Sequence, residues 1–471
     1  MSAFSQKFSE IIETHNVKAK EICCKLHIKE AYFSKLKNGM IIPPSYEYLE
    51  KIFKEIGLSA DENDELKKLY AELKFGDRYI YIKKILKKLY GDDKTDNTER
   101  VFFSDNFKKN SVISSKTQII NTIGYLFSNK QSHIRIKLQD AEIMEKISSI
   151  FTHENCRNDC IIYLENYSEN TNDNYNLSVF SNLAGIFSKF NIYVHAEYCS
   201  VKEIFRHCSF PFIIIGDTDA VLIDKDCQNA VHTDEPKKIE LLKQIFDNSF
   251  SSLPNFSICY NELLDFLYKS KEILTYSENN TDIVYVIKQC PCVLFGAKDP
   301  ELLWRHIKPS PQRNKLAALY QEWIYDYSKT TNHEFMLFSF KGLEKFFKSD
   351  EYYETARHLT LPVSKKIRYM CGQTLIEYSG RKKFIEPLLV NNSFLDDFSD
   401  CMINIWNNGN MLFVIDCGDR EGFFVVNDKC IANSIINFIK TASVDNFMLD
   451  STATIEIIRD MLDKNIGLIS K

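Results

Sequence analysis

Apolar and polar residues alternate at helical spacing through the first 60 residues of the chain. The pattern predicts four or five short amphipathic helices, which follow one another too closely to fold around separate cores. Asn38-Gly39 is a stop signal after the third helix, and Pro43-Pro44-Ser45 is a loop that ends in an N-cap residue for the fourth. The four apolar faces should share one small core and comprise, in chain order, Phe4, Phe8, Ile11 and Ile12; Ile22 and Leu26; Phe33 and Leu36; Leu49, Ile52, Phe53 and Ile56.

Residues 59–90 follow a different pattern. The stretch is acidic at its start and rich in lysine at its end, which is the charge order that a helix dipole favours. It predicts one or two connecting helices, broken or bent near Gly76. Residues 91–115 are polar and rich in turn formers, which is typical of a linker and gives the clearest domain boundary in the chain.

Strand-like runs alternate with helical segments after the linker. The runs at 134–138, 160–167, 191–198 and 210–216 predict an α/β domain over residues 116–255.

Residues 256–471 repeat this theme less regularly and predict a second α/β or α+β domain. They include strand-like runs at 284–295 and 335–340, and a hairpin at 411–428 before a closing helix. The order strand, turn, strand, helix begins both at Phe212 and at Leu412. Two related modules and chance recurrence of a common arrangement both account for this echo.

Composition excludes some classes of protein. The 471 residues are 44% hydrophobic and 13% aromatic, enough to form several cores. A formal net charge of −5 provides no broad basic field, so any contact with nucleic acid must be local. The 14 cysteines are thinly spread and predict reduced thiols. No apolar run approaches the roughly 18 residues that span a bilayer, so a cytoplasmic protein without a membrane partner is expected.

Residues 17–39 form a predicted unit of two helices with a distinct outer face. Ile22 and Leu26 would face inward from the first helix and Phe33 and Leu36 from the second, with Ile28 filling the turn. This arrangement leaves a set of side chains outside, near the start of the second helix, where side chains reach base edges in a major groove: Lys29, Glu30, Ala31, Tyr32 and Lys35.

With these positions, residues 4–58 resemble the DNA-binding domain of the lambda-repressor-like, Xre/Cro-type helix-turn-helix family. The match also includes Asn38-Gly39, the Pro43-Pro44-Ser45 entry and the helix around Leu49-Glu50-Lys51-Ile52. The resemblance implies that Glu30, Ala31, Tyr32 and Lys35 contact bases and that Asn38 contacts a phosphate. The expected DNA-binding set is Lys29, Glu30, Ala31, Tyr32, Lys35, Lys37 and Asn38.

Two positions depart from the family pattern. His27 stands where the turn usually has a small residue or glycine; histidine tolerates a left-handed conformation, so the turn survives at some energetic cost. Ala19 stands where a glutamine often contacts phosphate, so that contact is lost. Local charge supports the resemblance, because residues 1–40 hold seven lysines against four glutamates, a balance of +3, whereas residues 41–75 hold five lysines against eight acids.

A plain helical bundle with lysines on its solvated face is the alternative interpretation of this segment. We favour the helix-turn-helix, because the helix spacing, the apolar turn residue and the Asn-Gly stop agree. Glu30 could then accept from a cytosine amino group, and Lys35 could donate to guanine or phosphate.

The C-terminal region offers weaker chemical signals. Asp217, Asp219 and Asp419 lie beside glycines and could coordinate a cation, but both stretches are more typical of tight hairpin turns. His153, Cys156, Cys160, and the pair Cys290 and Cys292, lack the further ligands that a zinc site needs, so no metal is expected.

Motifs of the common enzyme classes are also missing. His306-Ile307-Lys308 is similar to the start of the phospholipase-D-type HxK motif, but Arg313 replaces the aspartate that should follow and the class is rejected. No Walker loop, GxGxxG, GxSxG or HExxH occurs, so neither an enzyme nor a cofactor is predicted.

The expected architecture is multidomain: an all-α helix-turn-helix head (1–58), a helical connector (59–90), the linker (91–115) and an α/β or α+β region. The expected function is sequence-specific regulation of transcription. Double-stranded DNA is one expected partner, a second copy of the chain another, since two half-sites lie about 34 Å apart. The C-terminal region would sense a small molecule or protein. The alternative is an interaction or enzymatic module that the head delivers to DNA, or a head that contacts protein only.

Overall fold

The computed structural model describes most of the chain. The described residues are 2–90, 112–127, 131–147, 156–166, 174–187, 192–260, 264–265, 267–268, 282–288, 308–348, 361, 364–379, 384–390, 402–406, 409–416, 421–445 and 447–466. The chain divides into two compact units. Unit 1 comprises Met1–Lys83, Ser277–Asn404 and Ser434–Lys471, and unit 2 comprises Lys84–Tyr276 and Ile405–Asn433. These bounds differ from the domain boundaries expected from the sequence, which stay predictions.

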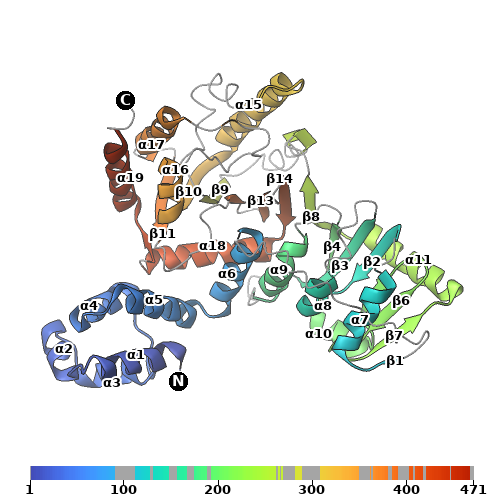
Figure 1. Ribbon diagram of the computed structural model, residues 1–471, viewed down its shortest axis with the longest axis horizontal. Coiled ribbons are helices and arrows are strands. Elements are labelled where there is room, and N and C mark those ends of the chain that lie inside the picture. The colour runs from blue at the N-terminus through green and yellow to red at the C-terminus, as the bar shows by residue number, and fades with distance from the viewer. Residues whose placement is uncertain are drawn as a thin grey trace. The chain divides into compact units, whose positions relative to one another are not determined.

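Unit 1 begins with consecutive helices that share one core (Figure 1). Phe8 is fully buried at the centre, and its ring lies 6.0 Å from the Phe33 ring and 6.1 Å from the Phe53 ring. The predicted small common core is therefore confirmed. The helices are α1 (Ala3–Thr14), α2 (Ala19–Leu26), α3 (Glu30–Lys37), α4 (Tyr46–Ile56), α5 (Ala60–Phe75) and α6 (Asp77–Tyr90), the last of which continues into unit 2.

Local signals set the ends of these helices. Ser2, Ser45 and Ser59 cap α1, α4 and α5 with their side chains, which satisfies backbone amides that a helix leaves without a partner. Gly57 ends α4 with a φ of 76°, a conformation that glycine adopts without a steric penalty. Gly76, with a φ of 58°, separates α5 from α6, so the predicted break at this residue is confirmed.

α5 packs into the helical bundle, although the sequence suggested a connector. Tyr70 is fully buried, and its ring lies 5.9 Å from the ring of Phe4 on α1. Leu66, one turn earlier on the same face, is fully buried as well. The first half of the expected connector therefore contributes to the core of the N-terminal helices.

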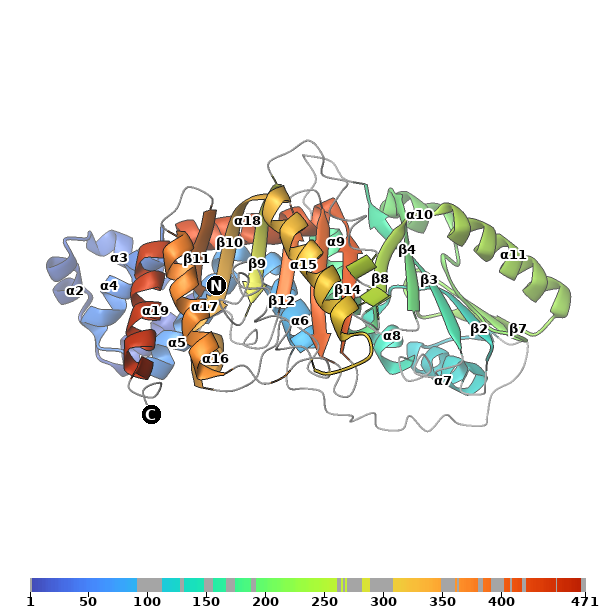
Figure 2. The same ribbon diagram turned by 90° about the horizontal axis from the view of Figure 1, so that it is seen from above.

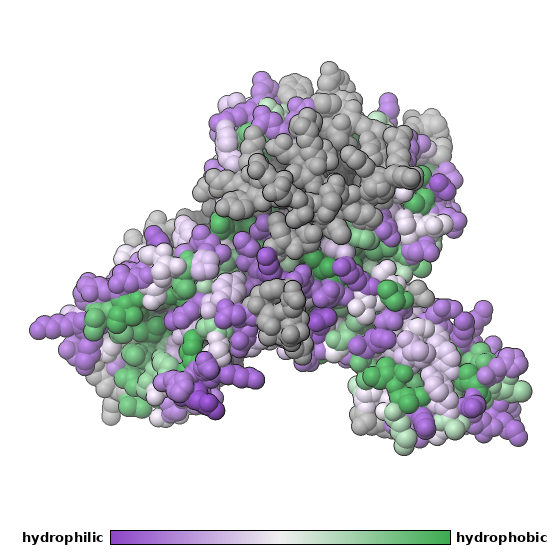
Figure 3. Space-filling model, turned by 180° about the vertical axis from the view of Figure 1, so that it is seen from behind, coloured by the Kyte–Doolittle hydropathy of each residue, from purple (hydrophilic) through white to green (hydrophobic). Residues whose placement is uncertain are grey.

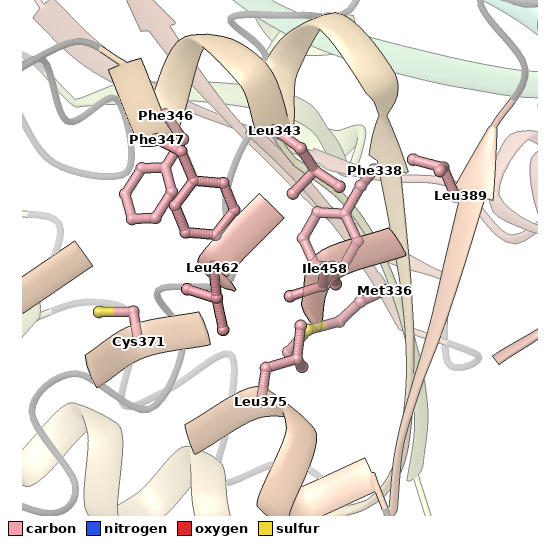
Figure 4. Packing of buried hydrophobic residues seen from close by; sticks show 10 residues of the cluster. All are labelled: Met336, Phe338, Leu343, Phe346, Phe347, Cys371, Leu375, Leu389, Ile458 and Leu462. Carbon is pink, nitrogen blue, oxygen red and sulfur yellow. The ribbon is translucent and has the colours of Figure 1, made fainter. Parts of the chain in front are cut away.

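The rest of unit 1 is a sheet with helices packed against it. β9 (Asp282–Lys288), β10 (Thr331–Ser339) and β11 (Phe384–Val390) are parallel neighbours, and the short β15 (Met448–Leu449) pairs antiparallel with β11. The helices of this part are α15 (Arg313–Thr330), α16 (Phe340–Lys348), α17 (Lys365–Ser379) and α19 (Ser451–Ile466). Figure 4 shows the core that β10, β11, α16, α17 and α19 form, with Phe338, Phe346 and Ile458 fully buried.

Unit 2 contains a mixed sheet in the order β1-β7-β6-β5-β2-β3-β4-β8-β14-β13. β2, β3 and β4 are parallel, and β5 and β8 pair antiparallel with the outer two of them. The strands are β1 (Val112–Ile113), β2 (His133–Lys137), β3 (Arg157–Glu165), β4 (Ile192–Cys199), β5 (Phe212–Ile215), β6 (Ala220–Ile223), β7 (Ala230–Thr233), β8 (Asn255–Tyr260), β13 (Asn410–Asp416) and β14 (Glu421–Asn427).

Helices cover both faces of the strands β2 to β4 (Figure 2). α11 (Pro236–Ser252) lies on one side and buries Phe246 and Phe250 against Ile161. α7 (Lys116–Phe127) and α8 (Ala141–Ile147) lie on the other side, and α9 (Asn174–Phe187) packs on α8, β3 and β4. α10 (Val201–His207) follows β4. The α/β class expected for the C-terminal region is thus confirmed. β12 (Met402–Trp406) and α18 (Lys429–Val444) each contain a boundary between the units.

The strand order shows a repeat, although its register differs from the one that the sequence suggested. β2-β3-β4-β8 in unit 2 and β9-β10-β11-β15 in unit 1 each consist of three parallel strands and one antiparallel strand. The hairpin β6-β7 is followed directly by α11, and the hairpin β13-β14 is followed directly by α18. The sequence echo, which began at β5 and at β13, was therefore one strand out of register. Two modules with the same order of strands account for these likenesses better than a single shared hairpin does.

Among the described residues, no helix has the length and apolarity to cross a membrane. In the face that Figure 3 displays, hydrophobic patches are separated by hydrophilic side chains. Met40 and Ile42, between α3 and α4, are 71% and 53% exposed. They therefore lie at the surface of the N-terminal helices, beside the segment that the sequence singled out.

Candidate nucleic-acid interface

α2 and α3 are joined by a turn of three residues, His27 to Lys29. His27 ends α2 in the left-handed conformation, with φ 53° and ψ 40°, as predicted from its tolerance of that region. The amide of Ile28 donates to the carbonyl of Cys23 at 3.0 Å, which closes the end of α2. Lys29 is extended and precedes the first residue of α3, so the chain changes direction within the turn.

The inward side of this pair of helices is smaller than the sequence suggested. Ile22, Phe33 and Leu36 are buried, as predicted. Leu26 and Ile28 are only half-buried, which corrects the expectation that all five side chains lie inside. Leu26 is the last residue of α2 and Ile28 lies in the turn, so both are at the edge of the core, where fewer neighbours surround a side chain.

Most of the expected DNA-binding residues lie on the outer surface. Lys29, Glu30, Ala31, Lys35 and Asn38 are exposed. Ala31 and Lys35 are four residues apart on α3 and so share one face of it. The described arrangement therefore brings the turn and the start of α3 together as one polar surface.

The lysines near this surface divide into paired and unpaired groups. Lys37 is half-buried and its Nζ lies 3.1 Å from a carboxylate oxygen of Glu13. Lys25 pairs with Glu55 at 3.0 Å, and the hydrogen bond to that carboxylate raises the pKa of the lysine. Within the described residues, the exposed lysines without an ion pair in this segment are Lys20, Lys29 and Lys35. Positive charge is thus uncompensated on α2, the turn and α3, whereas Lys37 already has a carboxylate partner.

Tyr32 is held by a residue that the sequence analysis did not single out. Its ring meets the ring of Tyr48, on α4, edge to face at 5.7 Å and 83°. Both tyrosines are half-buried, and burial, followed by the proximity of Tyr32, raises the pKa of Tyr48 to about 12. Tyr48 therefore stays neutral at physiological pH and supports Tyr32 from the side of α4. Periodicity within α4 could not reveal this contact, because it joins two different helices.

The first backbone amides of α2 and α3 have no side-chain cap, unlike those of α1, α4 and α5. Lys18 and Lys29, which precede these helices, make no side-chain cap, whereas serines cap α1, α4 and α5. Amides at an uncapped helix start carry partial positive charge and can donate to an anion such as a phosphate. Ala19 has no polar side chain to add to such a contact.

The other candidate sites are structural where the chain is described. The amide of Gly216 donates to the carbonyl of Asp219 at 2.9 Å between β5 and β6, so the predicted tight turn is confirmed. The carboxylate of Asp217 accepts from both the amide and the hydroxyl of Ser132 at 2.7 Å, and Asp219 pairs with His232 at 2.8 Å. Among the described residues no group of three or more potential metal ligands gathers.

Of the cysteine and histidine candidates, two are described by the structure and are buried, and the others lie outside the described residues. Complete burial raises the pKa of Cys160 to about 12, which keeps its thiol protonated. Cys156 is buried beside Asn158, at 3.8 Å. The candidates His153, Cys290, Cys292, His306 and Asp419, and most of the linker 91–115, lie outside the described residues, although β1 occupies the end of that linker.

Comparison with known proteins does not identify the chain. No protein-family model and no curated protein matches the sequence. Among solved structures, the chain is similar to phosphatidylserine synthase of Haemophilus influenzae Rd KW20, with 7% identity over 76% of this chain and 93% of that one. The TM-score of 0.23 is too low for this likeness to bear on fold or function.

Proposed function

We propose that the protein is a cytoplasmic, sequence-specific DNA-binding regulator of transcription, with α2 and α3 as a helix-turn-helix. The observation that carries the proposal is the outer surface of α3. There, exposed Lys29 and Lys35 have no carboxylate partner among the described residues and lie with Glu30 and Ala31 on a helix that follows a tight turn. Exposed lysines free of internal pairs are available to neutralise phosphates, and a short helix with a polar outer face fits a major groove.

Each side chain has a role in this proposal. Lys29 and Lys35 contact phosphates or a guanine edge, and Glu30 accepts from a cytosine amino group. Ala31 is small enough to bring the helix close to the bases and to meet a thymine methyl group. Tyr32 adds a further contact with DNA, and the Tyr48 ring that packs against it fixes its orientation. Lys37 contributes less than the sequence suggested, since Glu13 already neutralises it.

The proposal includes a homodimer and an effector. One head reads only a few base pairs, so useful specificity requires two heads on half-sites about 34 Å apart. The two α/β modules provide the dimer contact and bind a small molecule or protein. Such a ligand shifts the population of head arrangements, with a coupling of about 1 to 3 kcal/mol. No cofactor or catalytic step forms part of this proposal.

Charge substitutions test the assignment of α3. Lys35→Glu should weaken binding to a preferred duplex at least about tenfold, because it removes one contact and adds repulsion from phosphates. The matched control is Lys237→Glu on α11, the same charge reversal at an exposed lysine. Affinity is measured by fluorescence anisotropy, and folding by circular dichroism. If Lys35→Glu, folded, binds DNA as tightly as the control does, α3 does not read DNA, and a head that contacts protein becomes the better explanation.

A further inference from the structure

The segment after α18 inserts an aromatic side chain into the N-terminal helices of unit 1. Phe447 is fully buried, although it lies almost 400 positions along the chain from the helices it contacts. Its ring centre is 5.3 Å from that of Tyr46, 5.6 Å from that of Tyr70 and 5.2 Å from that of Phe75. Aromatic pairs at such distances contribute beyond the area they bury. We call Phe447 and these three rings the Phe447 anchor.

Polar contacts link the residues around the anchor to Asp445 and to the loop between α3 and α4. The ammonium of Lys74 lies 3.4 Å from a carboxylate oxygen of Asp445 and donates to the carbonyl of Pro44 at 3.3 Å. The hydroxyl of Tyr70 donates to the carbonyl of Pro43 at 3.0 Å. These two prolines belong to the loop between α3 and α4. The anchor is therefore bound to the loop that connects α3 to α4.

The anchor is also joined directly to the sheet of unit 1. Phe447 precedes β15, where Met448 pairs with Val390 and Leu449 with Leu389 of β11. On the other side, Phe438 of α18 contacts the Phe75 ring at 5.2 Å and the Tyr79 ring at 6.3 Å. A displacement of β15 or of the end of α18 must therefore move Phe447 or break its ring contacts.

A short chain of contacts leads from the anchor to α3. Tyr46 is the first residue of α4, and Tyr48, two residues later, meets Tyr32. Packed side chains transmit displacement because protein interiors have little free volume. The path from β15 to the outer surface of α3 thus consists of the ring contact of Phe447 with Tyr46, the backbone of the first turn of α4 between Tyr46 and Tyr48, and the ring contact of Tyr48 with Tyr32.

We propose that the Phe447 anchor sets the orientation of α3 and is the element through which the C-terminal region regulates DNA binding. The inference rests on the proposed function and names the device that performs its regulation. A ligand or partner that displaces β15 or α18 would release Phe447, and the loop around Pro43 and Pro44 would lose its support. The affinity of the head for DNA then changes without any change in a residue that contacts DNA.

The test compares two phenylalanine substitutions in the full-length protein. Phe447→Leu keeps an apolar side chain but loses the ring contacts of the anchor. Phe346→Leu is the matched control, because Phe346 is equally buried in unit 1 but lies in the core of Figure 4. Both should lower thermal stability. The probes are a duplex selected by the unmodified protein from a random-sequence pool and a scrambled duplex, with affinities corrected for the folded fraction.

We expect Phe447→Leu to change affinity for the selected duplex by about fivefold or more, the lower end of typical couplings between sites, and Phe346→Leu to leave it unchanged. The effects of Phe447→Leu and Tyr32→Ala on the free energy of DNA binding should be non-additive when the two are combined. The effects of Phe346→Leu and Tyr32→Ala should be additive. Hydrogen exchange should rise in α3 and in the α3–α4 loop only for Phe447→Leu.

Equal effects of the two leucine variants on affinity and exchange would overturn the anchor as a regulatory device and leave it a structural contact. The proposed function fails in a distinguishable way. If the unmodified protein selects no duplex, DNA recognition itself is wrong and the regulatory role falls with it. If the unmodified protein selects a duplex and Phe447→Leu binds it as tightly, only the anchor is wrong.

Discussion

At the scale of single residues, Lys67 departs from what its residue type predicts. It is 2% exposed, and its ammonium lies 4.2 Å from the centre of the Tyr46 ring. The ring face attracts the cation, but burial is the larger influence and lowers the pKa of Lys67 to about 8. Amphipathic patterning could not reveal this, because a lysine on a charged helix is expected in solvent.

The lowered pKa makes the stability of the N-terminal helices depend on pH. Below pH 8 both states are protonated and the folded state carries the full cost of a buried charge. Between pH 8 and the ordinary lysine value of 10.5, the folded state loses its proton first, so stability rises with pH. Lys67→Met should therefore raise stability at pH 7 by up to about 3 kcal/mol and remove most of the rise between pH 8 and pH 10.

Thermal unfolding of the N-terminal helices at pH 7 and pH 9.5 measures both effects. The range stops near pH 10 because burial raises the pKa values of Tyr46 and Tyr70, which gives the opposite slope at higher pH. Lys68→Met, a change of the neighbouring half-buried lysine, is the comparison variant. A lower stability of Lys67→Met at both pH values would show that the attraction of the Tyr46 ring and of the Glu50 and Asp64 carboxylates exceeds the cost of burial.

At the scale of elements, periodicity predicted the N-terminal helices and their ends well but not their partners. The cap at Ser45 and the break at Gly76 depend on neighbours in sequence, so local patterns contain them. The role of α5 in the bundle, the Tyr48 support and the Phe447 anchor join residues far apart in sequence. A helical pattern shows which face is buried, but it does not name what covers that face.

The turn between α2 and α3 gives a prediction at this scale. His27 has a left-handed conformation that costs a residue with a Cβ about 1 kcal/mol relative to glycine. His27→Gly should therefore keep or raise stability, by up to about 1 kcal/mol, and preserve DNA affinity. His27→Val, which is β-branched, should lower both. Urea unfolding and duplex binding provide the measurements, and a His27→Gly protein that folds but no longer binds would mean that the imidazole itself contacts DNA.

At the scale of the whole molecule, the sequence indicated a helical N-terminal part followed by an α/β region. Alternating strand-like and helical runs predicted α/β structure after the linker, and the mixed sheets confirm it. The units are discontinuous in sequence, because the C-terminal residues 434–471 belong to the same unit as the N-terminal helices. No local pattern marks such an arrangement, since it depends on which apolar surfaces meet after the chain has folded.

The central claim is that this molecule reads DNA sequence, and the most direct measurement is its binding to two duplexes over a series of salt concentrations. One duplex carries the DNA upstream of the protein's own gene and the other is a scrambled sequence of equal length. We predict that the specific duplex binds at least about a thousandfold more tightly, and that non-specific binding falls steeply as salt rises. Equal, weak binding of both duplexes, for the gene's own DNA and for duplexes drawn from a random pool, would contradict the claim.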